Sequence, residues 1–258
     1  MINVEVNGIP IAFCYIEGGR FKMGSNDYEA AQPIHEVEVP SFYLGRYPIT
    51  NEQFVPFLNA KGNQEEKGQR WVNLEGGYLG AKCGIKKSQD GFECIKGQEK
   101  HPMIYVNWYG AHAYCEWLSV QTGQAYHLPS ESAWEYAARG GKYQSRFSYA
   151  GSNYLNEVGW YGQNSHDQTK PVGLKFPNEL GLYDMSGNVW EWCTDYWHEN
   201  YEGAPTDGST WLTGGDSTRR VVRGGSWCEN DLRCRVSSRV RDFAMDRNSV
   251  IGFRVARY

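Results

Sequence analysis

The sequence predicts a loop-rich α+β fold in one domain. Its 258 residues, 40% hydrophobic and 15% aromatic, can bury a large core, and no Pro/Ser-rich linker divides them. Thirty glycines and ten tryptophans, with few long helical patterns, favour turns fixed by glycine and loops held by aromatic side chains. We therefore expect a single domain over residues 1–258 with little regular secondary structure.

Residues 1–19, MINVEVNGIPIAFCYIEGG, alternate apolar and polar side chains, which predicts a pair of strands. The pattern lacks the basic start and unbroken apolar run of a signal peptide, and no apolar run in the chain could cross a bilayer. The odd number of cysteines, with no C-x-x-C pair, fits a reducing compartment. We expect a cytoplasmic protein, while display on a cell surface or a phage stays open.

Three helices are predicted from capping residues and apolar stripes. Thr50 and Gln53 form a capping box at the start of NEQFVPFLNA. A second helix covers WYGAHAYCEWLSVQT and stops at Gly123, and a third follows Ser130 and stops at Gly140. Beyond the third helix we expect short strands and long turns.

Cys83 and Cys94 flank a predicted hairpin turn at SQDG. We expect two separate thiols there, with a disulfide as the alternative in an exported protein.

Charge excludes two classes of partner. The formal net charge of −4 gives no general attraction to nucleic acid or to an anionic membrane, so neither is expected. Residues 219–258 nevertheless contain ten arginines, four acidic residues and no lysine. Guanidinium groups suit forked bonds to carboxylates and loop carbonyls, and a solvated anion site is the alternative. Structural roles are expected for Arg223, Arg235, Arg239, Arg247 and Arg254.

Familiar catalytic motifs are missing from the sequence. The six histidines form no H-E-x-x-H and no H-x-D/E pair, and no G-x-S-x-G is present. Local spacing therefore predicts neither a non-haem iron triad nor a serine nucleophile.

Seven segments, in order along the chain, carry a family resemblance: IEGGRFKMGS, HEVEVPSFYLGRYPITNEQF, HPMIYVNWYGAHAYCEWLS, HLPSESAWEYAARGG, KPVGLKFPNELGLYDMSGNVWEWCTDYW, RVVRGGSW and IGFRVAR. Over nearly its whole length the chain resembles the formylglycine-generating enzyme, or sulfatase-modifying factor, superfamily. The resemblance implies a variant of the C-type lectin fold. It does not fix the function, because the superfamily holds copper-dependent oxidases, domains fused to sulfoxide synthases and non-catalytic binding proteins.

One function implied by the resemblance is a copper-dependent oxidase acting on a cysteine in a protein substrate. In those enzymes, two cysteines separated by four residues bind copper(I), an ion that prefers thiolates. Here Ser226 matches the motif serine and Cys234 the second cysteine, but Cys228 leaves five residues between the cysteines. One extra residue in a strand turns a side chain to the opposite face. The catalytic set Cys228, Cys234 and Ser226 is therefore the alternative hypothesis.

The same resemblance implies a structural calcium site at SGNVWEW. Its ligands would be Asn188, the carbonyl of Val189 and Glu191, since hard oxygen ligands on a turn suit calcium. The alternative is that Asn188 caps a turn while Glu191 pairs with an arginine.

The C-terminal segment also resembles the variable proteins of diversity-generating retroelements, which share this fold and vary between GGSW and IGFR. In such proteins, copying errors at adenines replace template asparagines. An asparagine codon changed at its adenines can encode Cys, Leu, Arg, Ser, Val, Asp or Phe. The presumed template-asparagine positions of the segment hold these residues or asparagine, and Glu229 is the exception. We therefore predict a variable segment over residues 227–250 that binds a protein or another macromolecule.

The predicted ligand-binding side chains are expected to line one solvent-facing surface. Beneath them, the frame residues Trp227, Cys234, Arg239, Ile251 and Phe253 are expected to be buried. The ligand-binding set is Cys228, Asn230, Leu232, Ser238, Val240, Asp242, Phe243, Asp246, Asn248 and Ser249.

Overall fold

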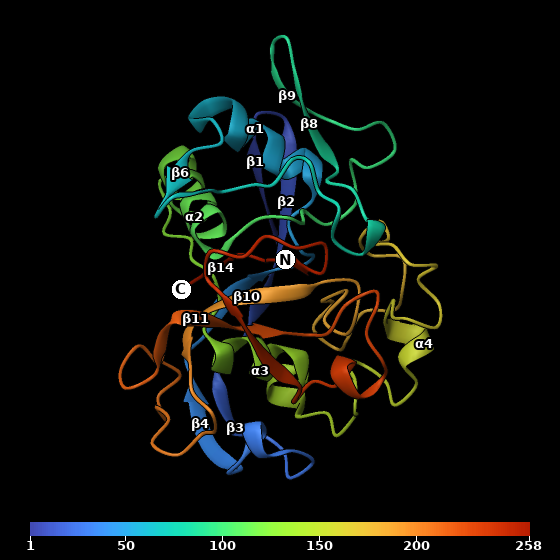
Figure 1. The fold of residues 1–258 in the computed structure, drawn as a ribbon. Coiled ribbons are helices and arrows are strands. Elements are labelled where there is room, and N and C mark those ends of the chain that lie inside the picture. Colours follow the sequence, from blue (N-terminus) through green and yellow to red (C-terminus); the bar gives the residue numbers. More distant parts are fainter.

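A four-stranded sheet crosses the middle of the molecule in the computed structural model, which describes residues 1–258 (Figure 1). Its strands, in spatial order, are β12 (Arg239–Phe243), β11 (Asp216–Arg223), β10 (Trp190–Trp197) and β13 (Ile251–Gly252). The β12–β11 and β11–β10 pairs are antiparallel, whereas β10 and β13 are parallel. The two eight-residue strands, β10 and β11, are longer than the short strands expected in this half of the chain.

A second four-stranded sheet joins the two ends of the chain. It contains β1 (Ile2–Val6), β2 (Ile9–Ile16), β5 (Phe42–Gly45) and β14 (Ala256–Arg257), in that order. The predicted N-terminal strand pair is therefore confirmed as β1 and β2.

Three two-stranded ribbons complete the strand structure. They are β3 (Gly19–Met23) with β4 (His35–Val39), β6 (Glu65–Glu66) with β7 (Gln69–Arg70), and β8 (Ile85–Ser88) with β9 (Gly91–Cys94). The last ribbon is the predicted hairpin, and Cys83 and Cys94 are free thiols.

The three predicted helices are confirmed as α1 (Asn51–Lys61), α2 (Trp108–Thr122) and α3 (Glu131–Ala138). The Gln53 side chain accepts from the Thr50 N–H at 3.0 Å at the start of α1. The α2 helix ends at Gly123, whose φ of 69° favours glycine. Ser130 caps α3 by accepting from the Ala133 N–H at 3.2 Å. A four-residue helix, α4 (Leu155–Val158), was not predicted.

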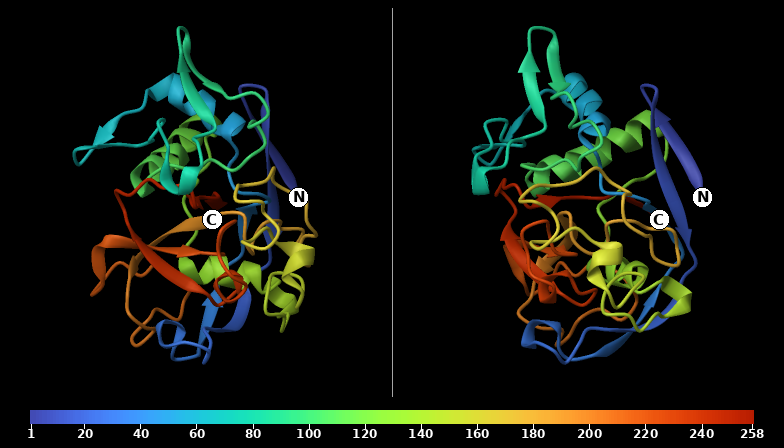
Figure 2. Two further views of the ribbon diagram at one scale, coloured as in Figure 1. Left: turned by 45° about the vertical axis from the view of Figure 1, so that its right-hand side comes forward. Right: turned by 90° about the vertical axis from the view of Figure 1, so that its right-hand side faces the viewer.

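Successive residues of a strand point to opposite faces of the sheet. Both faces of the central sheet are buried by other parts of the fold. Trp192 and its register partner Val222 pack in a core cluster with residues of α1 and α2. Cys193 and Val221 pack in another cluster with residues of α3. Figures 1 and 2 show α2 and α3 on opposite sides of the sheet. No helix has the length and apolar character needed to span a bilayer.

Candidate functional site

The C-terminal segment leaves β11 at its carboxyl end and returns along the same strand. It passes through a turn and a short 3-10 helix (Leu232–Cys234) before forming β12, which pairs only with β11. The right-hand view of Figure 2 shows this segment, in orange to red, at the left margin of the molecule. Because β12 is an edge strand, part of the segment faces solvent.

The predicted frame residues are all buried, as expected. The Trp227 indole N–H donates to the Ser249 carbonyl at 2.9 Å and ties the start of the segment to its end. Arg239 donates to both carboxylate oxygens of Glu131, at 2.6 and 2.9 Å, and so fixes β12 to α3.

The arginines of this region act as structural groups, as predicted. Arg223 forms buried salt bridges with Glu131 and with Glu135. Arg235 pairs with Asp27 at 2.7 Å. The remaining predicted arginines also bond to protein acceptors: Arg239 to Glu131, Arg247 to Gln69 and the Arg70 carbonyl, and Arg254 to Glu191.

Eight of the ten predicted ligand-binding side chains are at least partly accessible. Asn230, Leu232, Phe243 and Asp246 are exposed, and Cys228, Val240, Asp242 and Asn248 are partly buried. The prediction was wrong for the two others, because Ser238 is 2% exposed and Ser249 is 0% exposed. Both belong to backbone that the frame holds inward: Ser238 precedes the buried Arg239, and the Ser249 carbonyl accepts from Trp227.

Five of the eight accessible residues line two hollows, which lie near opposite ends of β12. Leu232 lines a hollow of about 560 Å³ together with Tyr28 of a distant loop and the buried Ser238. Asp242, Phe243, Asp246 and Asn248 line a hollow of about 600 Å³ with Gln69 and Tyr78. Sequence reasoning missed Tyr28, Gln69 and Tyr78, because no local pattern joins them to the C-terminal segment.

The hollow at the end of β12 combines an aromatic ring with a pair of acids. The guanidinium of Arg219 lies 4.5 Å from the ring centroid of Phe243. Burial and the neighbouring Asp246 raise the pKa of Asp242 to about 7. Asn248 donates to Asp242 at 2.7 Å and so holds the turn that follows the strand. Asp242 therefore keeps its proton to a higher pH than an exposed aspartic acid does.

Two of the three predicted calcium ligands, Asn188 and Glu191, are directed at protein donors. The Glu191 carboxylate accepts from Arg254 Nε and Nη2 at 2.6 Å and from Trp134 Nε1 at 2.6 Å. The Asn188 side-chain oxygen accepts from the Lys170 N–H at 3.0 Å. Because these oxygens are already occupied, this arrangement does not fit a calcium ion. It matches the alternative in which Asn188 orders a turn and Glu191 pairs with an arginine.

The two cysteines of the oxidase hypothesis differ in environment. Cys234 is buried, and its sulfur packs so closely on Gly225 that a Cβ added there would lie 2.6 Å from it. Burial raises the pKa of both thiols. Cys228 is partly exposed, and its sulfur lies 3.5 Å from the Ser226 hydroxyl.

Comparison with known proteins places the chain in one family. Residues 9–258 match the sulfatase-modifying factor enzyme 1-like domain. Serine/threonine-protein kinase Pkn1 of Chlamydia trachomatis is 35% identical, over 94% of this chain and 38% of that protein. The chain thus spans under two fifths of that relative. The formylglycine-generating enzyme of Thermomonospora curvata is 30% identical, over 93% of this chain and 91% of that enzyme.

Two solved structures resemble the whole chain. Treponema denticola variable protein 1 has a TM-score of 0.80 and 26% identity, over 99% of this chain and 98% of that protein. PvdO from Pseudomonas aeruginosa has a TM-score of 0.76 and 30% identity, over 95% of this chain and 93% of that one. These matches confirm the expected fold, the formylglycine-generating-enzyme type of C-type lectin fold, and the resemblance to variable proteins. The chain belongs to the family of sulfatase-modifying factor enzyme 1-like domains.

Proposed function

We propose that this protein is a ligand-binding variable protein of a diversity-generating retroelement. The observation that carries the proposal is the division of residues 227–250 into buried frame positions and accessible positions between them. The likeness to Treponema denticola variable protein 1, over nearly the full length of both chains, supports it.

The contacts around the segment suit a surface whose side chains vary. The frame is held by a buried indole bond from Trp227 and by the bidentate pair of Arg239 with Glu131. A rigid backbone loses little conformational entropy on binding, so a few exposed anchors can supply affinity. Leu232 and Phe243 are the exposed apolar residues best placed to be such anchors.

The spread of these anchors favours a macromolecule as ligand. Leu232 and Phe243 border different hollows, near the two ends of β12. A strand of this length spans roughly 13–17 Å, so one small molecule would not fill both hollows. A protein surface can contact both at once.

Sequencing of the DNA beside the gene tests this proposal. We expect a near-copy of the 227–250 coding segment, rich in AAC and AAT codons, next to a reverse-transcriptase gene. A complete flanking sequence with neither feature would refute the retroelement assignment.

A pair of randomised libraries tests whether the surface tolerates variation. One library varies Asn230, Leu232, Phe243 and Asp246, and the matched control varies four buried frame positions: Trp227, Cys234, Ile251 and Phe253. We expect most members of the first library and few of the second to resist proteolysis, because buried positions penalise changes of volume. Equal losses in both libraries would argue against a display surface.

The alternative function is a copper-dependent oxidase. The similarity of the chain to formylglycine-generating enzymes supports this alternative. It requires Cys228 and Cys234 to act as thiolates together. Its test is oxygen consumption with a cysteine-containing peptide after copper(I) loading. Activity that disappears in Cys228→Ser would establish the oxidase and overturn our proposal, whereas we expect neither variant nor parent to consume oxygen.

A further inference from the structure

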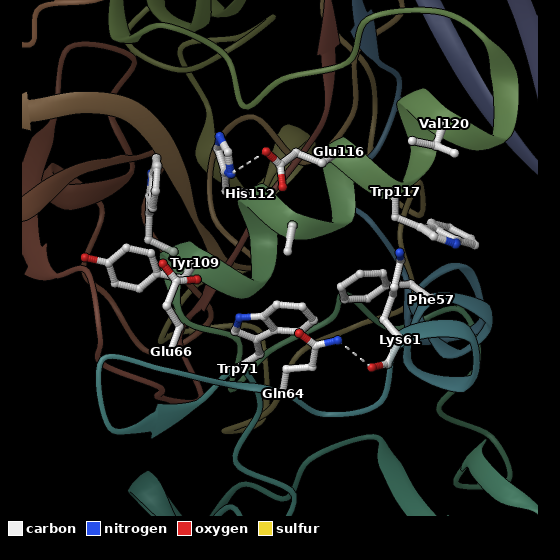
Figure 3. A pocket seen from close by; sticks show the side chains of 12 residues that line it. Phe57, Lys61, Gln64, Glu66, Trp71, Tyr109, His112, Glu116, Trp117 and Val120 are labelled. Atoms are coloured by element: carbon white, nitrogen blue, oxygen red, sulfur yellow. Dashed lines mark hydrogen bonds and ion pairs between the residues drawn. The ribbon is translucent and has the colours of Figure 1, made fainter.

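A third hollow, of about 590 Å³, lies away from the C-terminal segment, between α1, α2 and the β6–β7 ribbon (Figure 3). Lys61 and Glu66 both line it, so charges of opposite sign meet there and the lining favours no one class of ligand. A more specific arrangement surrounds one residue of the C-terminal segment. Glu229 is the presumed template-asparagine position that holds neither asparagine nor a residue of the expected set.

The Glu229 side chain reaches the first residue of β10. Its carboxylate oxygen Oε1 accepts from the indole N–H of Trp190 at 3.2 Å. Trp190 is 3% exposed, and an indole N–H that is buried without an acceptor is costly. The Glu229 carboxylate therefore satisfies a buried donor of the central sheet.

The backbone of Glu229 is fixed as well. Its carbonyl accepts from the Gly162 N–H at 2.9 Å, and its own N–H donates to the Ser226 carbonyl at 3.1 Å. The chain at Gly162 packs so closely that a Cβ added there would lie 3.1 Å from the Glu229 carbonyl oxygen. Side-chain and backbone contacts thus hold this residue from two sides.

Trp190 connects the two ends of the C-terminal segment. Its indole bonds to Glu229 near the start, and its backbone N–H donates to the Val250 carbonyl at the end, at 2.8 Å. The Trp227 indole makes a second link, to the Ser249 carbonyl. Two indoles therefore close the base of the segment, and Glu229 supplies the acceptor for one of them.

We propose that Glu229 is a positioning residue of the binding surface. Its carboxylate holds Trp190 and so sets the place at which the accessible stretch, which begins at Asn230, leaves the frame. An asparagine on the same backbone would end one bond short of the indole, which accounts for the longer side chain at this position. The inference rests on the proposed function, since only that function makes the segment a binding surface.

Hydrogen exchange of the ¹⁵N-labelled full chain tests the anchoring at two N–H groups without a ligand. The Trp190 indole signal is assigned by its loss in Trp190→Phe, and the Gly162 amide signal by sequential assignment. In Glu229→Ala we expect both groups to exchange about tenfold or more faster. The indole loses its acceptor, and the carbonyl to which Gly162 donates is no longer held in place. If Glu229→Ala does not fold, Glu229→Asn takes its place with the same expectation.

Two further variants are the controls. Glu229→Gln keeps an acceptor oxygen at the same reach and should exchange as slowly as the parent protein at both groups. Asp231→Ala removes an exposed carboxylate two residues away and should leave both rates unchanged. The proposal is overturned if Glu229→Ala leaves either rate unchanged, or if Asp231→Ala raises both rates equally. Flanking DNA without a template copy would refute the retroelement assignment and would leave these exchange rates as they are.

Discussion

Truncation of Phe243 distinguishes an exposed binding side chain from a core residue. Phe243 is 45% exposed, whereas Phe253 in the frame is 0% exposed. Full burial of a phenylalanine side chain contributes about 1.5–3 kcal/mol, so a ring that is roughly half buried contributes about 1 kcal/mol. The contact with Arg219 adds about 0.5 kcal/mol at an exposed site. Phe243→Ala should therefore lower the free energy of unfolding by about 1–2 kcal/mol.

The matched control is Phe253→Ala, for which about 3–5 kcal/mol is expected because it leaves a cavity in the core. Urea unfolding followed by tryptophan fluorescence gives both values under the same conditions. A loss in Phe243→Ala as large as that in Phe253→Ala would show that the end of β12 belongs to the core. The display proposal would then lose its main apolar anchor.

Three further predictions concern ionisable groups. The pKa of Asp242 is raised to about 7, so the native state binds this proton more tightly than the unfolded chain does. The stability that the bound proton contributes is present at low pH and is lost as the pH rises from about 4 to 7. The free energy of unfolding, measured with urea, should fall less over that pH range in Asp242→Asn than in the parent protein. An equal fall in both proteins would refute the raised pKa of Asp242. Because the Glu191 carboxylate is already paired with Arg254, the Tm should be the same in EDTA as in calcium. A Tm several degrees higher in calcium would support the calcium-site hypothesis instead. Arg254→Ala should lower the free energy of unfolding by about 3–5 kcal/mol, because it leaves the buried Glu191 charge unpaired. The control, Arg233→Ala at the surface, should change it by less than about 0.5 kcal/mol. Similar losses in the two variants would contradict the buried pair.

Local chemistry in the sequence determined the helices and the first strand pair. Capping groups such as Thr50 with Gln53, and Ser130, act within three residues, so their effect can be predicted without knowing the rest of the fold. The resemblance to variable proteins likewise identified Trp227, Cys234 and Arg239 as anchors of the C-terminal segment before their partners were known.

Only the tertiary structure decided how that segment meets solvent. Ser238 and Ser249 have small polar side chains, which are typical of an exposed loop, but both residues are buried. Ser238 lies next to the buried Arg239, and the Ser249 carbonyl accepts from the Trp227 indole. The partner of Arg239 is Glu131, 108 positions earlier in the chain, and no local pattern specifies such a pair. The same holds for the hollows at the ends of β12, whose walls come from loops far apart in sequence. Burial and cavity shape depend on packing between distant segments, and a single sequence read position by position does not contain that packing.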